Sequence, residues 1–429
     1  MEKMKFKHLK GKSEDEVSTI GALAKKYHAG IELPLIFQYL LRVNVLPVGT
    51  CIEIYGPKGS SKSSLALEWC QKFVDSSGYA IYLDSENKLP ADIGKFFLGG
   101  KREKYVTYRR MKNMTETANT SEDLIKQIEK NEEKLKKAGK RIPHGIMVID
   151  SLICGLGTSE EKRVNKSGID SQGAFAPYAS VWTDFFRYVN TALHNLNCTL
   201  MVINQFRQNV GQFTGGGGHS PGGEAKEHAL SFAIEIQPKG RTQKENIVEA
   251  YKEFKVRITK NTSGPSDDGF GQNQNTSTSE AMRLCWNNVT RTFWYDYSRP
   301  LCSIITKFLS PGTGIEGFGP LKDLTKYGGV FTSKSMDFEK LESREVEAII
   351  ENTPEIKNSF QEQLGIAKRP IIGKPRVYEE DEKKEEEKEQ GTDEESQEFQ
   401  CEFCDKKPYK REGDLINHIQ KEHSEQTDN

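Results

Sequence analysis

The 429-residue sequence contains no apolar run long enough to cross a membrane, since even residues 146–156 are interrupted by Asp150 and Ser151. The first 17 residues are charged and lack the apolar core of a secretory signal. The eight cysteines are scattered, and Cys401 and Cys404 alone lie close together. This distribution argues against a disulfide scaffold and favours a reducing compartment with one metal site. The absences together predict a soluble, cytoplasmic protein with no membrane partner.

Charge is unevenly distributed along the chain, although the formal net charge is −1. Residues 379–398 contain 12 acidic residues and three lysines, so the first 378 residues carry a net positive charge. A basic body with an acidic tail is common in proteins that bind polyanions. A tail that merely keeps the protein in solution is the alternative.

Short apolar runs alternate with helical patterns through most of the chain. Strands are expected at residues 51–55, 79–83, 146–149, 199–203, 232–236 and 254–258. Helices are expected at residues 14–28, from Pro34, from Ser64, at 121–138, at 181–196 and at 341–365 with a break near Pro354. The alternation predicts an α/β fold with a mainly parallel twisted sheet and helices on both faces. Ligands bind such sheets beyond the carboxyl ends of the strands.

Residues 56–63, with the sequence GPKGSSKS, lie between an expected strand and an expected helix. A loop of small residues that ends in Lys-Ser in this context is typical of a phosphate-binding P-loop. Lys62 is predicted to reach the β- and γ-phosphates, and the Ser63 hydroxyl to bind Mg²⁺. Ser61 stands where the usual pattern has glycine, and the stretch taken alone would also suit a flexible turn.

Polar side chains follow three further strands. Asp150 is predicted to orient Mg²⁺, Glu86 to activate the attacking water, and Gln205 to sense the γ-phosphate. Each alone would also suit a solvated turn at a strand end, but together with the loop they predict one nucleotide site. The predicted nucleotide-binding residues are Gly56, Pro57, Lys58, Gly59, Ser60, Ser61, Lys62, Ser63, Ser64 and Asp150.

These motifs stand in the order seen in the RecA-type recombinases. The chain resembles that family, and most closely the UvsX-like recombinases of bacteriophages. The resemblance covers roughly residues 30–310 and rests on residues 46–57, 83–86, 148–151, 203–207 and 211–223. UvsX-like proteins also place a residue other than glycine before the P-loop lysine. The resemblance implies a RecA-like P-loop NTPase core.

The resemblance also implies roles for single residues. Glu86 matches the catalytic carboxylate, and Gln205 matches the residue that couples nucleotide to DNA. Lys260 matches a lysine that acts across a subunit interface on the neighbour's γ-phosphate, while Thr262 occupies the second such position. The predicted catalytic residues are Glu86, Lys62, Gln205 and Lys260.

Two long connections, near residues 155–178 and 206–223, interrupt the compact pattern, and loops of this length are usually functional. The second contains seven glycines, which suit close backbone approach, beside aromatic and basic residues that suit base separation and phosphate contact. By resemblance these are the DNA-binding loops; two surface loops without a DNA role are the alternative. The predicted DNA-binding residues are Lys162, Arg163, Lys166, Phe206, Arg207 and Phe213.

Near the C-terminus, Cys401, Cys404, His418 and His423 have the order and spacing of a Cys₂His₂ zinc finger. Zn²⁺ would supply the folding free energy of so small a unit. The finger lies outside the resemblance, and both weak DNA docking and protein contact are open as its role.

The sequence divides into five parts. They are an N-terminal helical segment at a protomer interface (1–45), a RecA-like ATPase core (46–335), a C-terminal helical segment (336–377), a disordered acidic linker (378–400) and the small zinc finger (401–423).

The predicted function is ATP-dependent DNA strand exchange by filaments on single-stranded DNA, in homologous recombination, repair and recombination-dependent replication. The resemblance favours a phage protein acting in the host cytoplasm. The predicted cofactors are ATP, Mg²⁺ and Zn²⁺. The predicted partners are single-stranded and double-stranded DNA, further copies in a helical filament, a single-strand-binding protein and a loading mediator. The alternatives are a ring-forming RecA-fold helicase or motor ATPase, and a non-catalytic DNA-binding adaptor.

Overall fold

The computed structural model describes residues 29–152, 176–205, 223–245, 248–262, 281–298, 300–301 and 343–376. The helices in these ranges are α2 (Leu35–Leu41), α3 (Lys62–Asp75), α4 (Ala91–Leu98), α5 (Met114–Lys137), α7 (Ala176–Ala192), α8 (Gly223–Ala229), α10 (Ser343–Asn352) and α11 (Pro354–Gln363). Two short 3₁₀ helices are η3 (Gly100–Tyr105) and η4 (Leu193–Asn195). The strands are β1 (Gly30–Glu32), β2 (Val45–Pro47), β3 (Cys51–Gly56), β4 (Tyr79–Asp84), β5 (Val106–Arg110), β6 (Gly145–Asp150), β7 (Cys198–Gln205), β8 (Leu230–Lys244), β9 (Glu249–Asn261), β10 (Met282–Asn287) and β11 (Phe293–Asp296).

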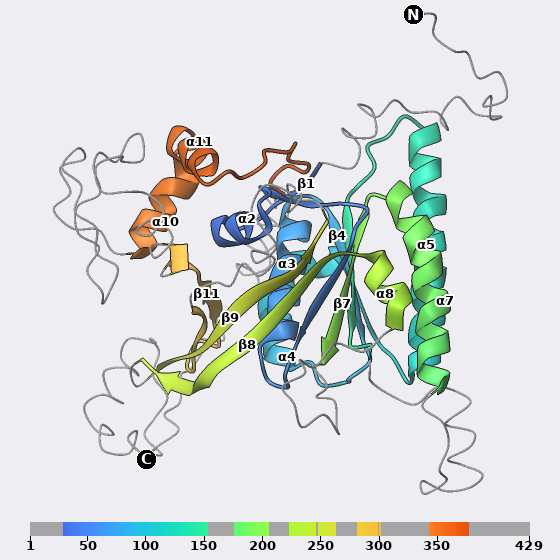
Figure 1. Ribbon diagram of the computed structural model, residues 1–429, viewed down its shortest axis with the longest axis horizontal. Helices are drawn as coiled ribbons and strands as arrows, with labels where there is room; N and C mark the ends of the chain where they lie inside the picture. The colour runs from blue at the N-terminus through green and yellow to red at the C-terminus, as the bar shows by residue number, and fades with distance from the viewer. Residues whose placement is uncertain are drawn as a thin grey trace, which may run out of the picture.

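A nine-stranded sheet with the order β11-β10-β9-β8-β3-β7-β6-β4-β5 forms the centre of the protein (Figure 1). The six strands from β8 to β5 in this order are parallel to one another. Strands β9, β10 and β11 extend the sheet with antiparallel pairing. The predicted α/β fold with a mainly parallel sheet is therefore confirmed.

Both faces of the central strands are buried, and successive side chains enter two different apolar layers. Ile146 and Val148 of β6 pack in the layer with α2 and α3, whereas Met147 and Ile149 pack in the layer with α5 and α7. Figure 1 shows α5, α7 and α8 on one side of the sheet and α2 and α3 on the other. Burial on both faces explains why these strands read as continuous apolar runs.

Several element boundaries differ from those expected. The charged helix starts at Met114 rather than near residue 121, because the Asn113 side chain caps it by accepting a hydrogen bond from the Glu116 backbone N–H at 2.9 Å. The strands expected at 232–236 and 254–258 are parts of the longer pair β8 and β9. The break near Pro354 is confirmed, since α10 ends at Asn352 and α11 begins at Pro354. The helix expected at 14–28 lies outside the described residues.

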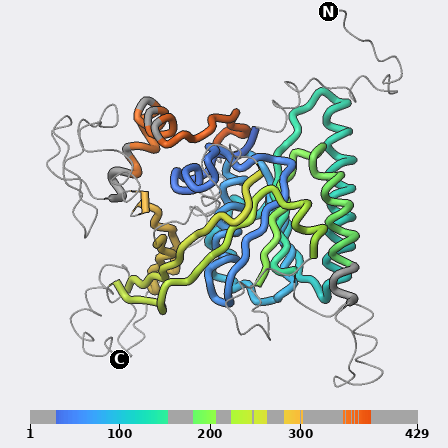
Figure 2. Tube along the Cα trace, viewed as in Figure 1, coloured from blue at the N-terminus to red at the C-terminus, as the bar shows by residue number. Residues whose placement is uncertain are grey.

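The chain after α11 returns to the start of the core and forms a C-terminal strap, residues 366–376. The Gly30 N–H donates to the Pro370 carbonyl at 3.1 Å, and the Ile372 N–H donates to the Gly30 carbonyl at 2.9 Å. Near the start of the strap, the Ala367 N–H donates to the Arg42 carbonyl at 3.0 Å. Figure 2 shows this orange segment beside the blue N-terminal part of the core. The first and last described segments are thus joined by main-chain hydrogen bonds.

Candidate nucleotide-binding site

The predicted P-loop joins β3 to α3 at the edge of the sheet where the parallel strands end. A Cβ atom on Gly56 would lie 2.2 Å from the Ile236 backbone oxygen of β8, so a larger residue here would force the two strands apart. Ser61 has a φ of 65°, in the left-handed region, immediately before α3 begins at Lys62. The loop therefore turns sharply into a helix N-terminus, which is the backbone arrangement that binds phosphate.

Lys62 is the buried basic residue of this loop, with 7% of its surface exposed. Its Nζ donates hydrogen bonds to the carbonyl oxygens of Gly56 at 3.1 Å and Pro57 at 2.8 Å, and to the Ser60 hydroxyl at 3.3 Å. Burial lowers the pKa of Lys62, and the nearby Asp150 carboxylate acts in the opposite direction. The partners of the ammonium group within the loop are neutral oxygens, and a phosphate would be a stronger one.

Asp150 ends β6 and lies beside the first turn of α3. It is 5% exposed, and its Oδ2 accepts a hydrogen bond from the Tyr82 hydroxyl at 2.6 Å. Burial raises the pKa of Asp150 to about 6, while hydrogen bonds from Ser63 and Tyr82 oppose that rise. The structure thus brings together Ser63 and Asp150, the two residues predicted to bind Mg²⁺.

Glu86 and Gln205 are in direct contact, although 119 positions separate them in the sequence. The Gln205 Nε2 donates to Glu86 Oε1 at 2.7 Å, and the Ser151 hydroxyl donates to the same oxygen at 3.0 Å. The carboxylate predicted to position water is therefore held by residues at the ends of two other strands.

The register of the sheet explains why these residues meet. Gly56 is paired with Gln205 across β3 and β7, and Asp84 is paired with Asp150 across β4 and β6. Parallel neighbours end at one level, so residues that follow different strands gather at one edge. The predicted catalytic residues Lys62, Glu86 and Gln205 all belong to this edge.

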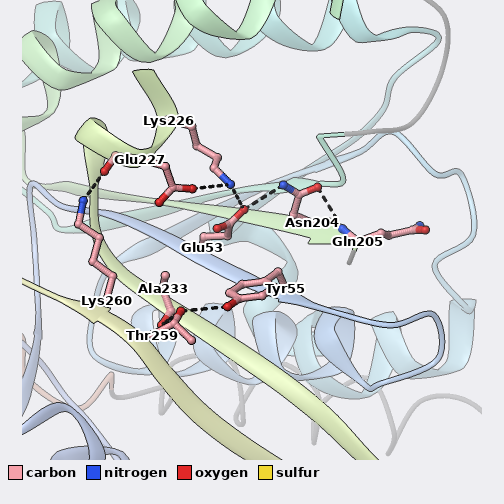
Figure 3. Close-up of polar contacts among 9 residues, drawn as sticks. All are labelled: Glu53, Tyr55, Asn204, Gln205, Lys226, Glu227, Ala233, Thr259 and Lys260. Carbon is pink, nitrogen blue, oxygen red and sulfur yellow. Dashed lines mark hydrogen bonds and ion pairs between the residues drawn. The ribbon is translucent and has the colours of Figure 1, made fainter. Parts of the chain in front are cut away.

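Lys260 lies elsewhere. It is half-buried on β9, where its register partner is Ala233 near the start of β8, and its Nζ donates to the Glu227 backbone oxygen. In Figure 3 its side chain points toward Glu227 and away from Gln205. Within one protomer, Lys260 does not join the nucleotide site.

Three residues at the site were not predicted. Tyr82 supports Asp150, the Ser151 hydroxyl supports Glu86, and the Lys252 Nζ donates to the Gly59 carbonyl of the loop. Tyr82 lies between Ile81 and Leu83 in an apolar strand, so no local pattern marks its hydroxyl as functional. Ser151 directly follows Asp150 and could have been named from that position.

The predicted DNA-binding residues Lys162, Arg163, Lys166, Phe206, Arg207 and Phe213 lie outside the described residues, as do Cys401, Cys404, His418 and His423. Among the residues that the structure does describe, no group of three or more His, Cys, Asp or Glu side chains is arranged to bind a metal ion. A Mg²⁺ ion in a nucleotide site needs no such group, because it binds one or two protein oxygens together with phosphates and water.

Comparison with known proteins identifies the family. The profile of the RecA N-terminal domain matches residues 34–267, which is more than half of the chain. The chain belongs to the RecA family. In chain order, the RecA match thus includes strands β3 to β9, and it also includes the whole candidate nucleotide site.

Individual RecA proteins are distant relatives. The chain is 23% identical to Protein RecA of Mycoplasma mobile over 260 residues, which is 59% of this chain and 71% of the relative. It is 27% identical to Protein RecA of Streptococcus gordonii over 228 residues, 51% of this chain and 52% of the relative. It is 28% identical to Protein RecA of a Mycobacterium species over 229 residues, 52% of this chain and 58% of the relative. The chain therefore spans only about half the length of several RecA proteins that it matches.

Proposed function

We propose that this protein is an ATP-dependent DNA recombinase that pairs and exchanges DNA strands. The family match supports ATP binding and recombination chemistry in general. The observation that carries the proposal is the hydrogen bond between Gln205 and Glu86. It links the carboxylate proposed to act in hydrolysis to the last residue of β7, directly before the glycine-rich residues 206–223 proposed to bind DNA.

The geometry of the site supports the roles that we propose for its residues. Backbone N–H groups of the loop and the Lys62 ammonium would bind the phosphates of ATP. Ser63 and Asp150, which are already in contact, would hold Mg²⁺, which supplies positive charge to the phosphates. Glu86 would orient the attacking water, with its carboxylate direction fixed by Ser151 and Gln205.

The proposed coupling to DNA works through displacement of one side chain. If Gln205 turned toward a γ-phosphate, it would leave Glu86, and the main chain that follows β7 would shift with it. DNA affinity would then depend on the bound nucleotide, which is the property that a recombinase requires.

We propose that protomers join head to tail into a helical filament on single-stranded DNA, with Lys260 reaching the γ-phosphate of the neighbouring protomer. The exposed position of the Lys260 contact, at the surface rather than in the nucleotide site, is compatible with that role. The resemblance to UvsX-like proteins supports a phage origin, and with it a single-strand-binding protein and a loading mediator as partners. The spacing of Cys401, Cys404, His418 and His423 supports a zinc finger.

A joint-molecule assay tests the proposal. Purified protein with ATP and Mg²⁺ should join single-stranded DNA to a homologous duplex and should not join it to a heterologous one. Lys62→Ala and Glu86→Gln should each abolish DNA-stimulated ATP turnover. Closed rings in electron micrographs with a non-hydrolysable ATP analogue, or joint molecules formed without homology, would contradict it.

A further inference from the structure

The strand that leads into the P-loop carries a fully buried ion pair next to the nucleotide site (Figure 3). Glu53 of β3 is 1% exposed, and Lys226 of α8 has a completely buried side chain. The Lys226 Nζ lies 2.7 Å from Glu53 Oε1. Glu53 and Gly56 belong to the same strand, β3, so the pair is connected to the phosphate-binding loop by a short stretch of extended backbone.

The same Glu53 oxygen also accepts a hydrogen bond from Asn204 of β7. The Asn204 Nδ2 donates to Glu53 Oε1 at 2.9 Å, and Asn204 Oδ1 accepts from the Gln205 backbone N–H at 3.0 Å. One carboxylate oxygen thus holds the last residues of β7, which precede residues 206–222, and α8, which follows them. A single atom on the P-loop strand therefore contacts both flanking elements.

Glu227 makes two further polar contacts of helix α8. The carboxylate of Glu227 lies 3.2 Å from the Lys226 Nζ, and the backbone oxygen of Glu227 accepts from Lys260 of β9. The helix is therefore fastened to the sheet by charged groups on β3 and β9 as well as by the apolar contacts of Ala229.

An ion pair of this kind contributes geometry more than it contributes stability. Removing two charges from water costs free energy that their attraction barely repays, and apolar side chains of equal volume usually stabilise a fold as well. A charged pair accepts fewer arrangements than an apolar contact, because both charges must keep their partners.

We propose that Glu53 and Lys226 are positioning residues that tie α8 to the P-loop strand, so that the state of the nucleotide site reaches both ends of the proposed DNA-binding segment. This inference rests on the proposed function. Without the tie, nucleotide would still bind, and α8 would no longer follow the strand end. The predicted defect is a loss of coupling between the two ligands.

The test compares the affinity for a fluorescent single-stranded oligonucleotide in the presence of a non-hydrolysable ATP analogue and of ADP. The decisive variant is the double substitution Glu53→Gln with Lys226→Met, which removes both charges and leaves an amide oxygen on β3 that can accept from Asn204. Lys226→Met alone removes the ammonium group beside the buried Glu53 carboxylate and should lower Tm by about 10 °C, whereas the double substitution should recover most of that loss. If the ion pair had only a structural role, the double substitution would restore the coupling together with Tm.

The double variant is expected to bind a fluorescent ATP analogue with an affinity within about twofold of wild type. The ratio of its DNA affinity with the ATP analogue to that with ADP should fall by at least about fivefold, which is the lower limit of typical coupling. The matched control, Glu362→Gln with Lys368→Met, removes an exposed ion pair of 2.7 Å outside the site and should keep the wild-type ratio. A double variant that keeps the wild-type ratio overturns the inference.

Asn204→Ala gives an independent measurement, because it leaves the ion pair in place and removes the bond on the β7 side. It should also reduce the ratio, and an unchanged ratio would likewise overturn the inference. A wild-type protein whose DNA affinity is equal with both nucleotides would instead overturn the proposed function, and with it this inference.

Discussion

At the scale of single residues, the P-loop shows how a backbone requirement can be met by an unfavourable residue. Ser61 has a φ of 65° and makes no side-chain capping hydrogen bond to α3. The left-handed conformation costs a residue with a Cβ atom about 1–2 kcal/mol. The loop therefore carries a small conformational cost at the residue directly before Lys62.

Ser61→Gly is expected to raise the free energy of unfolding by about 0.5 kcal/mol, because relief of the left-handed conformation exceeds the added flexibility of the unfolded chain. Urea denaturation followed by circular dichroism would measure it. Gly59→Ala is the matched control with the opposite sign, since Gly59 has a φ of 73° and an added Cβ would meet nothing nearer than the Lys252 Nζ at 3.5 Å. A loss of stability in Ser61→Gly would contradict this account.

Titration of the Glu347 carboxyl group on α10 should contribute to the pH dependence of stability. It lines a cavity of about 330 Å³, where burial raises its pKa to about 7, with Glu351, Asp296 and Glu68 adding to the rise and Lys72 opposing it. The folded protein thus holds this proton at higher pH than the unfolded chain does. The free energy of unfolding should fall as pH rises from about 4.5 through about 7.

Glu347→Gln should match the wild type near pH 4.5 and be more stable at about pH 8, by about 1 kcal/mol after allowance for solvent screening. Thermal unfolding at the two pH values would measure the difference. Equal Tm differences between variant and wild type at both pH values would show that the carboxyl group does not titrate in this way.

At the scale of helices and strands, the sequence predicts the central strands of the sheet and misses β5 at one edge and β10 and β11 at the other. The central strands are visible as apolar runs because helices cover them on each side. Strand β5 was missed because it lies at the sheet edge with residues Thr107–Arg110 exposed, so it has no apolar signal. The contact between Glu86 and Gln205 required strand order and register, which local patterns do not contain.

The start of α5 could have been predicted from Asn113 and Glu116, which have the spacing of a capping box. Asn113→Ala should destabilise the protein by about 1 kcal/mol, since it removes the acceptor for the Glu116 N–H. Asn113→Asp keeps that acceptor and should remain near wild type. Urea denaturation of the two variants would compare them, and equal losses would indicate that the cap is not the cause.

At the scale of the whole molecule, charge separates the basic body from the acidic tail. Deletion of residues 378–429 should strengthen binding to single-stranded DNA at low salt, because the deleted residues carry net negative charge that competes with DNA. Fluorescence titrations at low and high salt would measure the effect, which should shrink as salt screens it. Deletion of 401–429 alone keeps the acidic stretch and should change little. Equal or weaker affinity after the longer deletion would contradict this prediction.

The family match ends at residue 267, yet the described core continues to the C-terminal strap.

None of the described helices has the combination of length and apolar character that a bilayer crossing needs.

The strap has a consequence for how the protein is made. Asn44 contacts Arg369 of the strap across 325 positions, and Arg42 contacts the Leu364 carbonyl, just before the strap, across 322. During translation the opening stretch of the core leaves the ribosome early and must wait for partners synthesised near the end. Formation of these contacts is expected to be a late folding event. Ribosome stalling before residue 372 would therefore leave strand β1 of the nascent chain without the hydrogen bond that Ile372 donates to Gly30.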